Sequence, residues 1–177
     1  MKEKLTRDDV IAALRQMADD LAASADELRQ LDAAIGDGDL GITMGLGFGA
    51  VKETLAEVVD ADIGTVLLKT GMAFNRKAAS TFGALYASMM MRAAKEAKGL
   101  MELGVGDLAK LVAAAAEGVQ ARGKASAGDK TMLDALLPAS EALATAASQG
   151  LGLPEAMERA TGAAEQGMLA TREMKSK

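Results

Sequence analysis

The chain has no cysteine, no histidine and no tryptophan among its 177 residues, and only three phenylalanines and one tyrosine. Without histidine and cysteine it cannot form a Ser-His-Asp triad, a cysteine nucleophile, a phosphohistidine relay or the common zinc sites. Disulfides are excluded too, which favours a cytoplasmic protein. The carboxylates, lysines, arginines and hydroxyls that remain suit hard cations and phosphates better than acyl transfer.

Excess positive charge and long hydrophobic runs are also missing. The net charge is -5 and the pI is about 4.9, whereas nucleic acids and anionic membranes require a concentrated basic face. No apolar run approaches the 18 or more residues of a membrane span, and the start MKEKLTRDD lacks the apolar core of a signal peptide. We therefore expect neither nucleic acid nor a membrane as the main partner.

The apolar half of the chain is rich in alanine and methionine, which favours helix-on-helix packing. Its length fits a single domain covering residues 1–177. Helical apolar spacing, with breaks at glycine, proline and capping residues, predicts eight helices. The first carries Val10, Leu14, Met17 and Leu21 on one face, and the others cover approximately residues 24–32, 42–58, 62–75, 81–97, 107–121, 131–148 and 154–173. The short connections predict an all-α fold, an antiparallel up-and-down bundle or barrel.

Individual residues refine these boundaries. Thr6 to Asp9 resembles a capping box ahead of the first helix, and Pro154 suits the first turn of the last one. Pro138 falls inside the seventh predicted helix and should kink it or mark its true start. Of the consecutive residues 89–91, all methionine, at least one should be exposed, where a partner could cover it.

Three glycine-bearing loops, at residues 36–41, 79–83 and 123–130, are predicted to meet at one end of the bundle. The first is the most unusual, because Asp32, Asp37 and Asp39 fall within eight positions and no lysine or arginine lies between residues 31 and 43. Such carboxylates repel one another unless a divalent cation is bound. Magnesium suits them, because it takes one or two carboxylates and completes its shell with water and phosphate oxygens. The next helix would present free N–H groups near residues 41–43 to the same phosphates.

Other interpretations use the same residues. A solvated turn remains open, since aspartate and glycine are ordinary turn residues. Residues 36–41 match the G-x-G-x-x-G of dinucleotide folds, but no predicted strand precedes them. An EF-hand starting at Asp37 fails, because Ile42 and Phe48 stand where glycine and glutamate are needed. Residues 118–125 have Walker A spacing but end in alanine instead of a hydroxyl residue, inside a predicted helix.

Two motifs carry a family resemblance over essentially the whole chain. The run from Leu31 to Asp39 followed by Gly41, and the segment from Arg122 to Ala135, resemble the signatures of the L subunit of dihydroxyacetone kinase and its fused relatives. The resemblance implies an eight-helix barrel that holds ADP or ATP at one end through two magnesium ions on Asp32, Asp37 and Asp39. By the same motifs, the implied nucleotide-binding residues are Leu40, Gly41, Ile42, Thr43, Ser80, Thr81, Phe82, Gly123 and Met132.

The resemblance also implies a function. The family's other subunit holds the ketose on a histidine, so this histidine-free chain would be the nucleotide half of a small-ketose kinase, acting with a ketose-binding partner subunit. The phosphoryl donor would be either exchangeable ATP or a phosphotransferase protein acting on bound ADP, and a homodimer is possible. An alternative from another class is a non-catalytic nucleotide-binding sensor or adaptor that regulates a partner protein.

The chain departs from the family pattern in a few places. Leu40 stands where many members have histidine, and Ala79 to Gly83 replaces a G-G-A-S-G loop, which leaves the choice of ketose open. Arg76 and Lys77 could approach the phosphates or belong to a solvated helix face. The family continues past Met174 into a basic, glycine-rich segment that touches the nucleotide. This chain stops at Lys177, so we expect weaker nucleotide retention than in full-length relatives.

Overall fold

The computed structural model describes residues 3–175, which form eight α-helices and one short strand pair. The helices are α1 (Arg7–Ala23), α2 (Ala25–Ala33), α3 (Leu40–Glu57), α4 (Ile63–Lys77), α5 (Thr81–Glu96), α6 (Val105–Gly123), α7 (Leu133–Ser148) and α8 (Leu153–Ala170), and α8 continues into a 3-10 turn, η1 (Thr171–Glu173). The strands are β1 (Leu5–Thr6) and β2 (Glu102–Leu103). The predicted all-α class and the number of helices are confirmed.

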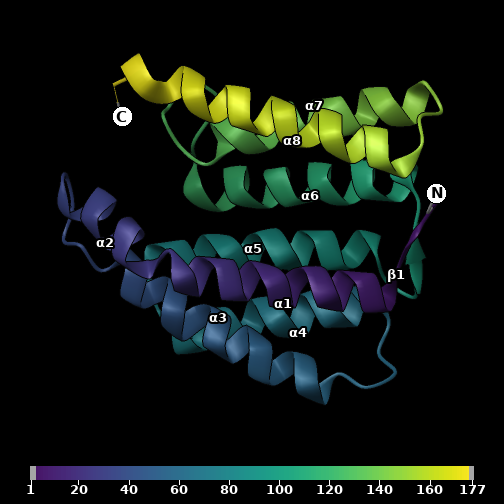
Figure 1. Ribbon diagram of the computed structural model, residues 1–177, viewed down its shortest axis with the longest axis horizontal. Helices are drawn as coiled ribbons and strands as arrows, with labels where there is room; N and C mark the ends of the chain where they lie inside the picture. Colours follow the sequence, from purple (N-terminus) through teal and green to yellow (C-terminus); the bar gives the residue numbers. More distant parts are fainter. Residues whose placement is uncertain (1–2, 176–177) are drawn as a thin grey trace.

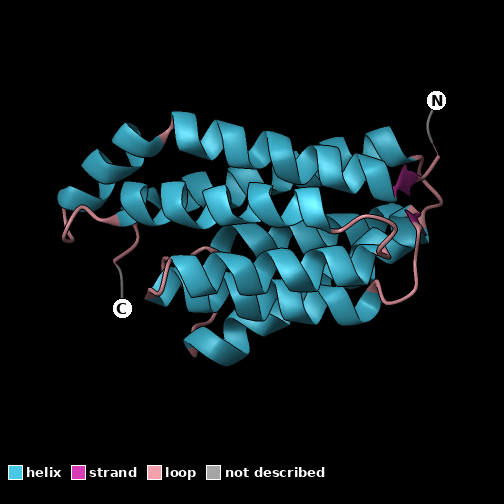
Figure 2. Cartoon of the chain, turned by 90° about the horizontal axis from the view of Figure 1, so that it is seen from below, coloured by secondary structure: helices cyan, strands magenta, loops and turns pink. Residues whose placement is uncertain are grey.

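The helices lie roughly parallel to the long axis of the molecule, in an antiparallel bundle (Figures 1 and 2). From α3 onward each helix packs against the next one along the chain, and α1 packs against α3. Because the direction alternates, the connections fall into two sets, one at each end of the bundle. The α2–α3 connection and the C-terminal segment lie at the same end, on the left in Figure 1.

Capping residues set several helix ends as the sequence predicts. The Thr6 Oγ1 accepts a hydrogen bond from the Asp9 amide, and the Asp9 carboxylate accepts one from the Thr6 amide at 2.7 Å, which completes the predicted capping box. Pro154 lies in the first turn of α8. Pro138 lies inside α7, which begins at Leu133, so it does not mark the start of that helix.

Two apolar clusters form the core. The larger joins residues of α1 and α3–α6, and its fully buried side chains include Phe48, Phe74 and Ile63. All four aromatic residues meet in it, with Phe48 and Phe74 edge to face at a centroid distance of 5.0 Å. The smaller cluster joins α6, α7 and α8 and consists mostly of alanine, which lets these helices approach closely.

The strand pair was not predicted. Strands β1 and β2 pair antiparallel, with Leu5 opposite Leu103, and the Arg7 amide donates to the Met101 carbonyl at 2.8 Å. This short ladder ties the start of α1 to the α5–α6 connection, at the end opposite the α2–α3 loop (Figure 1). Two-residue strands give no alternation for a sequence pattern to reveal.

Candidate functional site

The aspartate loop connects α2 to α3. Its backbone is held by the Asp32 carbonyl, which accepts hydrogen bonds from the amides of Ile35 at 3.1 Å and Gly36 at 2.6 Å. Gly38 has a φ of +74°, a conformation that glycine adopts without steric cost. The glycines noticed in the sequence therefore shape the turn that returns the chain to α3.

The Asp32 carboxylate is fixed by the same turn. Its Oδ2 accepts a hydrogen bond from the Leu40 amide at 3.2 Å, so a side chain from α2 caps the first residue of α3. A Cβ at position 36 would lie 2.5 Å from the Asp32 Oδ1, so any larger residue there would force this carboxylate to move. Asp32 is partly buried, whereas Asp37 and Asp39 are exposed.

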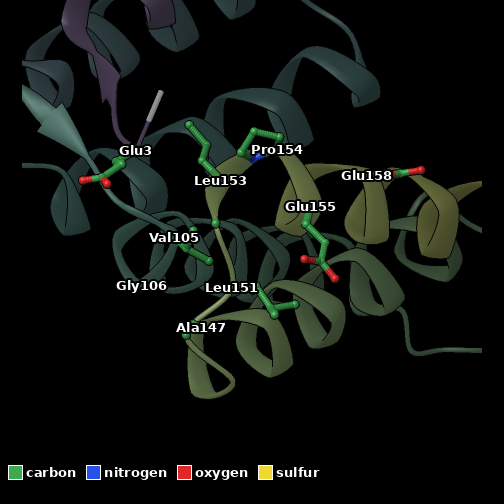
Figure 3. Close-up of a pocket in the computed structure, with 11 residues that line it drawn as sticks. Glu3, Val105, Gly106, Ala147, Leu151, Leu153, Pro154, Glu155 and Glu158 are labelled. Carbon is green, nitrogen blue, oxygen red and sulfur yellow. The ribbon is translucent and has the colours of Figure 1, made fainter. Parts of the chain in front are cut away.

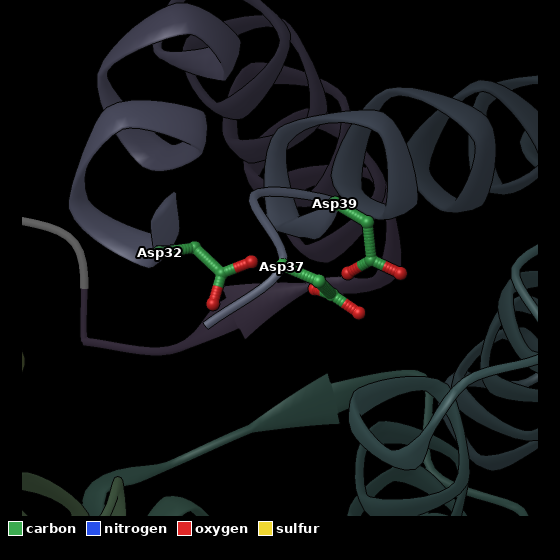
Figure 4. A group of neighbouring side chains, drawn as sticks. All are labelled: Asp32, Asp37 and Asp39. Carbon is green, nitrogen blue, oxygen red and sulfur yellow. The ribbon is translucent and has the colours of Figure 1, made fainter. Parts of the chain in front are cut away.

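The three predicted carboxylates converge on one point (Figure 4). Asp32, Asp37 and Asp39 each offer an oxygen, and these oxygens all lie within 4.8 Å of one another. The negative charge of Asp37 raises the pKa of Asp39, with smaller contributions from burial and from the charge of Asp32. Three converging oxygens that repel one another are a donor set that fits a divalent cation such as magnesium, which would cancel the repulsion.

Helix α3 begins beside these carboxylates. Its first amide, that of Leu40, is bonded to Asp32, and the Thr43 amide is bonded to the Asp39 carbonyl at 2.9 Å. The amides of Gly41 and Ile42, which lie between these two, donate to no acceptor among the described residues. Asp39 occupies the N-cap position but makes no side-chain cap bond, which leaves its carboxylate available. The start of α3 thus pairs free N–H donors with a carboxylate cluster, as a metal-bound phosphate requires.

The other two predicted loops lie at the same end of the bundle as the aspartate loop. The alternating helices place the α4–α5 and α6–α7 connections there (Figure 1). The Lys130 ammonium in the α6–α7 loop donates to the Met174 carbonyl at 3.1 Å, which ties the C-terminal segment to this end. The prediction that the three loops lie at one end of the bundle is confirmed.

A hollow of about 380 Å³ lies between α5, the C-terminal end of α6 and the start of α7. Thr81, Gly123 and Met132, three of the residues expected to bind nucleotide, line it together with Leu85, Val119 and Thr131, among others. Most of the lining is apolar, and the volume is within the range of small-molecule sites, roughly 300–1,000 Å³. These features suit a flat heterocyclic base, and we call this cavity the base hollow.

The two remaining predicted residues lie beside this hollow without lining it. Ser80 is the N-cap of α5 and accepts a hydrogen bond from the Gly83 amide at 3.0 Å. The Phe82 ring packs into the aromatic cluster, 5.8 Å from Phe74 and 6.4 Å from Tyr86 between ring centroids. The Phe82 side chain is only partly buried, but it does not line the hollow. Arg76 and Lys77, at the last turn of α4, are both exposed.

Sequence reasoning missed Asp134, the residue that shapes the α6–α7 loop. Its buried carboxylate accepts hydrogen bonds from the amides of Thr131 at 2.8 Å and Gly128 at 2.5 Å. These two bonds, the Thr131 one first, lower the pKa of Asp134 against the opposing effect of burial. A signal was available, since Thr131-x-x-Asp134 has the spacing of a capping box.

A larger hollow, of about 850 Å³, lies at the opposite end of the bundle, between the start of α6 and the α7–α8 connection (Figure 3). Its lining includes Glu3, Glu155 and Glu158 and no lysine or arginine. None of the predicted site residues belongs to it. Among the described residues, its glutamates do not form a converging group that could hold a cation, as Asp32, Asp37 and Asp39 do, so we place the candidate site at the end with the aspartates.

Comparison with known proteins identifies the family of the chain. The sequence model of the DAK2 domain matches residues 34–177, which include Asp37, Asp39, the start of α3 and the whole base hollow. The chain belongs to the DAK2 domain family. Asp32 stands two residues before the matched region.

Individual DAK2 relatives are kinases or kinase subunits. The chain is 34% identical over 173 residues to the "PEP-dependent dihydroxyacetone kinase, ADP-binding subunit DhaL" of Escherichia coli, covering 98% of this chain and 82% of the relative. It is 40% identical over 132 residues to the "PEP-dependent dihydroxyacetone kinase 2, ADP-binding subunit DhaL" of Listeria innocua, covering 73% of this chain and 61% of the relative. It is 37% identical over 160 residues to the "L-erythrulose kinase" of Pectobacterium atrosepticum, covering 89% of this chain.

The relatives differ in how much of their length this DAK2 chain accounts for. It spans only 61% of the Listeria innocua subunit and 27% of the L-erythrulose kinase. The region similar to this chain therefore makes up the larger part of one relative and a minor part of the other.

Among residues 3–175, none of the helices combines the length and the apolar character that a membrane span requires.

Proposed function

We propose that this chain is the ADP- or ATP-binding subunit of a dihydroxyacetone-type kinase, and that it acts together with a ketose-binding partner subunit. The observation that carries the proposal is the convergence of Asp32, Asp37 and Asp39 within 4.8 Å beside the unpaired amides of α3. The names of the relatives, which specify ADP binding and dihydroxyacetone or erythrulose kinases, support the choice of ligand and reaction.

Each part of the site has a task in this proposal. The amides of Gly41 and Ile42, with the positive end of the α3 dipole, bind phosphate oxygens. The hollow around Thr81, Gly123 and Met132 takes the base. Leu40 and Thr43 hold the first turn of α3 in position through their own backbone bonds, and Ser80 fixes the start of α5 beside the base.

Asp32, Asp37 and Asp39 would hold magnesium, which supplies charge neutralisation for the transferring phosphoryl group when it is bound. The protein's own contribution is positioning, because phosphoryl transfer needs little covalent chemistry from side chains. The capping bond from Leu40 to Asp32 keeps one carboxylate in register with the phosphate-binding amides. The carboxylate that would bind the metal and the N–H groups that would bind phosphate are thus parts of the same turn.

The acceptor must come from outside the chain. The chain has no histidine to hold a ketose, so a partner subunit binds the ketose and presents the ketose hydroxyl in line with the terminal phosphoryl group. The donor is either exchangeable ATP or a phosphotransferase protein that rephosphorylates bound ADP. The words "PEP-dependent" in the names of two relatives favour the second possibility.

Calorimetric titration of ADP into the isolated chain, with and without magnesium, tests the nucleotide site. We expect each ligand to increase the affinity for the other, because the carboxylates repel phosphate until a cation is bound. Replacing Asp37 by Asn should abolish this mutual dependence, whereas replacing the exposed Asp26, on the first turn of α2, should leave it unchanged. ADP binding that ignores magnesium would contradict the proposed site.

Turnover separates the kinase from the adaptor. With the purified partner subunit and dihydroxyacetone, the chain should support phosphoryl transfer, and Asp37→Asn should lower the rate by at least about a hundredfold. Normal magnesium-dependent ADP binding without any transfer, from either donor, would favour the regulatory alternative.

A further inference from the structure

Charge is distributed unevenly over the helices. Consecutive helices α4, α5 and α6 carry seven basic and three acidic residues, a formal charge of +4, although the whole chain carries -5. The basic residues are Lys69, Arg76, Lys77, Arg92, Lys95, Lys110 and Arg122, and the acidic ones are Glu96, Asp107 and Glu117. The rest of the chain therefore carries -9. Where these basic side chains share one face of the molecule, that face favours an acidic partner.

Two hollows give this surface its shape. One, of about 310 Å³, lies between α4 and α5 and is lined by Met72, Arg76 and Met91, among others. The other, of about 270 Å³, lies between α5 and α6 and is lined by Met91, Arg92, Lys95 and Arg122, among others. Met91 belongs to both, so the hollows adjoin across α5. We call the surface formed by the two hollows the α4–α6 groove.

Exposed apolar side chains lie among these charges. Met72 is 54% exposed and Met91 is 46% exposed, and Leu68 lies one turn before Met72 on the same face of α4. Methionine is flexible and polarizable, so it adapts to the apolar side chains of a partner. The combination of apolar anchors with a charged rim is typical of a protein docking surface.

The groove's cations are largely free to bind a partner. Within the described residues Arg76, Lys95 and Arg122 make no ion pair, and Arg92 approaches Glu117 only at 4.0 Å. Binding an acidic segment would therefore break at most one weak pair. Such contacts mainly increase the association rate and select the partner.

The groove is continuous with the nucleotide site. Arg122 lines both the α5–α6 hollow and the base hollow, and Arg76 lies in the last turn of α4, close to the end with the aspartates. A subunit that presents a ketose at that end can extend along α5 without leaving the surface. Arg122, which lines both hollows, would then lie between that subunit and the base hollow.

We propose that the α4–α6 groove docks an acidic, methionine- or leucine-bearing segment of the ketose-binding partner subunit. This inference rests on the proposed function, because it assigns the surface through which that subunit is held. The segment places its carboxylates against Arg92 and Lys95 and its apolar side chains against Met72 and Met91. Arg122 links occupancy of the groove to the edge of the base hollow.

The test measures binding of the purified partner subunit to three forms of the chain by calorimetry, at low and at moderate salt. The forms are wild type, the double variant Arg92→Glu/Lys95→Glu, and the matched control Arg15→Glu/Arg159→Glu on α1 and α8. The control has the same net charge as the double variant and also loses one exposed ion pair, Arg159 with Glu155. Circular dichroism checks folding, and Arg92→Gln/Lys95→Gln replaces the double variant if it is unfolded.

We expect the double variant to bind the partner at least about tenfold more weakly at low salt, with a smaller difference at higher salt, because the charges are exposed. The control should bind like wild type, and all forms should bind ADP with magnesium equally well. Equal partner binding by wild type and double variant overturns the groove assignment and leaves the proposed function intact. Failure of wild type to bind the partner overturns both.

Two further outcomes would reassign the groove. Concentration-dependent self-association of the chain alone, lost in the double variant, would show that the occupant is a second copy. Binding to vesicles containing anionic lipid, lost in the same variant, would show that it is a membrane surface. Either result contradicts the assignment to the partner subunit.

Discussion

Asp134 provides the most demanding test of how the nucleotide end is built. Its carboxylate accepts the amides of Thr131 and Gly128 and so holds the loop that carries Thr131 and Met132 into the base hollow. Gly128 and Lys130 have positive φ angles, of +88° and +57°, so the loop needs these bonds to stay in its conformation. The perturbation is Asp134→Asn, which keeps the shape and removes the charge.

The expected loss follows from the two hydrogen bonds. A bond to a charged acceptor contributes roughly 1.5–3 kcal/mol, and a neutral one about 1 kcal/mol. Asparagine keeps a single acceptor oxygen and turns an NH2 group toward the second amide. One bond is therefore lost and the other weakened, for a total of about 2–4 kcal/mol of unfolding free energy. For a domain of this size that corresponds to a melting temperature roughly 5–15 °C lower.

The dependence on pH gives a second readout. Because folding lowers the pKa of Asp134, its stabilising contribution is complete above the ordinary aspartate value of 3.8 and is lost as the pH falls through the lower folded pKa. The difference in stability between wild type and Asp134→Asn should be constant from pH 7 to about pH 5 and should shrink below about pH 4.

Urea unfolding followed by circular dichroism measures both quantities. Asp26→Asn is the matched control, because it removes the same charge at an exposed position on the first turn of α2, where the carboxylate lies 3.8 Å from Arg29. This control substitution should lower the free energy of unfolding by less than about 1 kcal/mol. A stability of Asp134→Asn within about 1 kcal/mol of wild type, with no narrowing at low pH, would refute the argument that this carboxylate organises the loop.

Three further changes test other parts of the structure. Asp37→Asn removes the charge that most strongly raises the pKa of Asp39, so the metal-free protein should melt at a higher temperature at pH 7. The variant should also lose the rise in melting temperature that magnesium and ADP cause together in wild type. A rise that persists in the variant would contradict the metal site. Tyr86→Phe removes a buried hydroxyl that has no partner among the described residues, so urea unfolding should show a gain of about 1 kcal/mol, and a clear loss would reveal a missed partner. Gly83→Ala places a Cβ 2.2 Å from the Ala78 carbonyl oxygen, so it should cost about 1–3 kcal/mol in the same assay, whereas Gly162→Ala, with open space around it, should be neutral or stabilising.

Much of the fold could be predicted because its causes are local. Capping residues and breaks in apolar spacing fixed most helix ends to within two residues, as at Thr6 for α1 and at Pro154 for α8. Pro138 was ambiguous, since sequence alone allowed it to begin α7 or to interrupt it. Pro138 has no N–H, so the Asp134 carbonyl lacks its usual i+4 donor. Gly167 of the neighbouring helix α8 packs against this carbonyl, where a Cβ would lie only 2.1 Å from the oxygen. The space around the proline therefore depends on another helix.

The residues of the candidate site could likewise be predicted where the cause is local, and could not be predicted where it depends on the core. The aspartates could be predicted because their crowding is visible within eight positions of sequence. The separation of Phe82 from the hollow could not, because it depends on where Phe74 and Tyr86 lie in the core. Metal and nucleotide binding by these residues stays a prediction, as does a homodimer.

By itself the sequence limited the chemistry that is possible here. With no histidine or cysteine, three clustered carboxylates and a glycine turn predict a cation and phosphate site, and alanine-rich helical spacing predicts the all-α fold class. The tertiary structure alone decided which distant residues share a surface. It joined Thr81, Gly123 and Met132 in one hollow and gathered the cations of α5 and α6 in the α4–α6 groove. The reason is physical, since local patterns act through neighbouring residues, whereas cavities and charged faces arise from the packing of helices far apart in the chain.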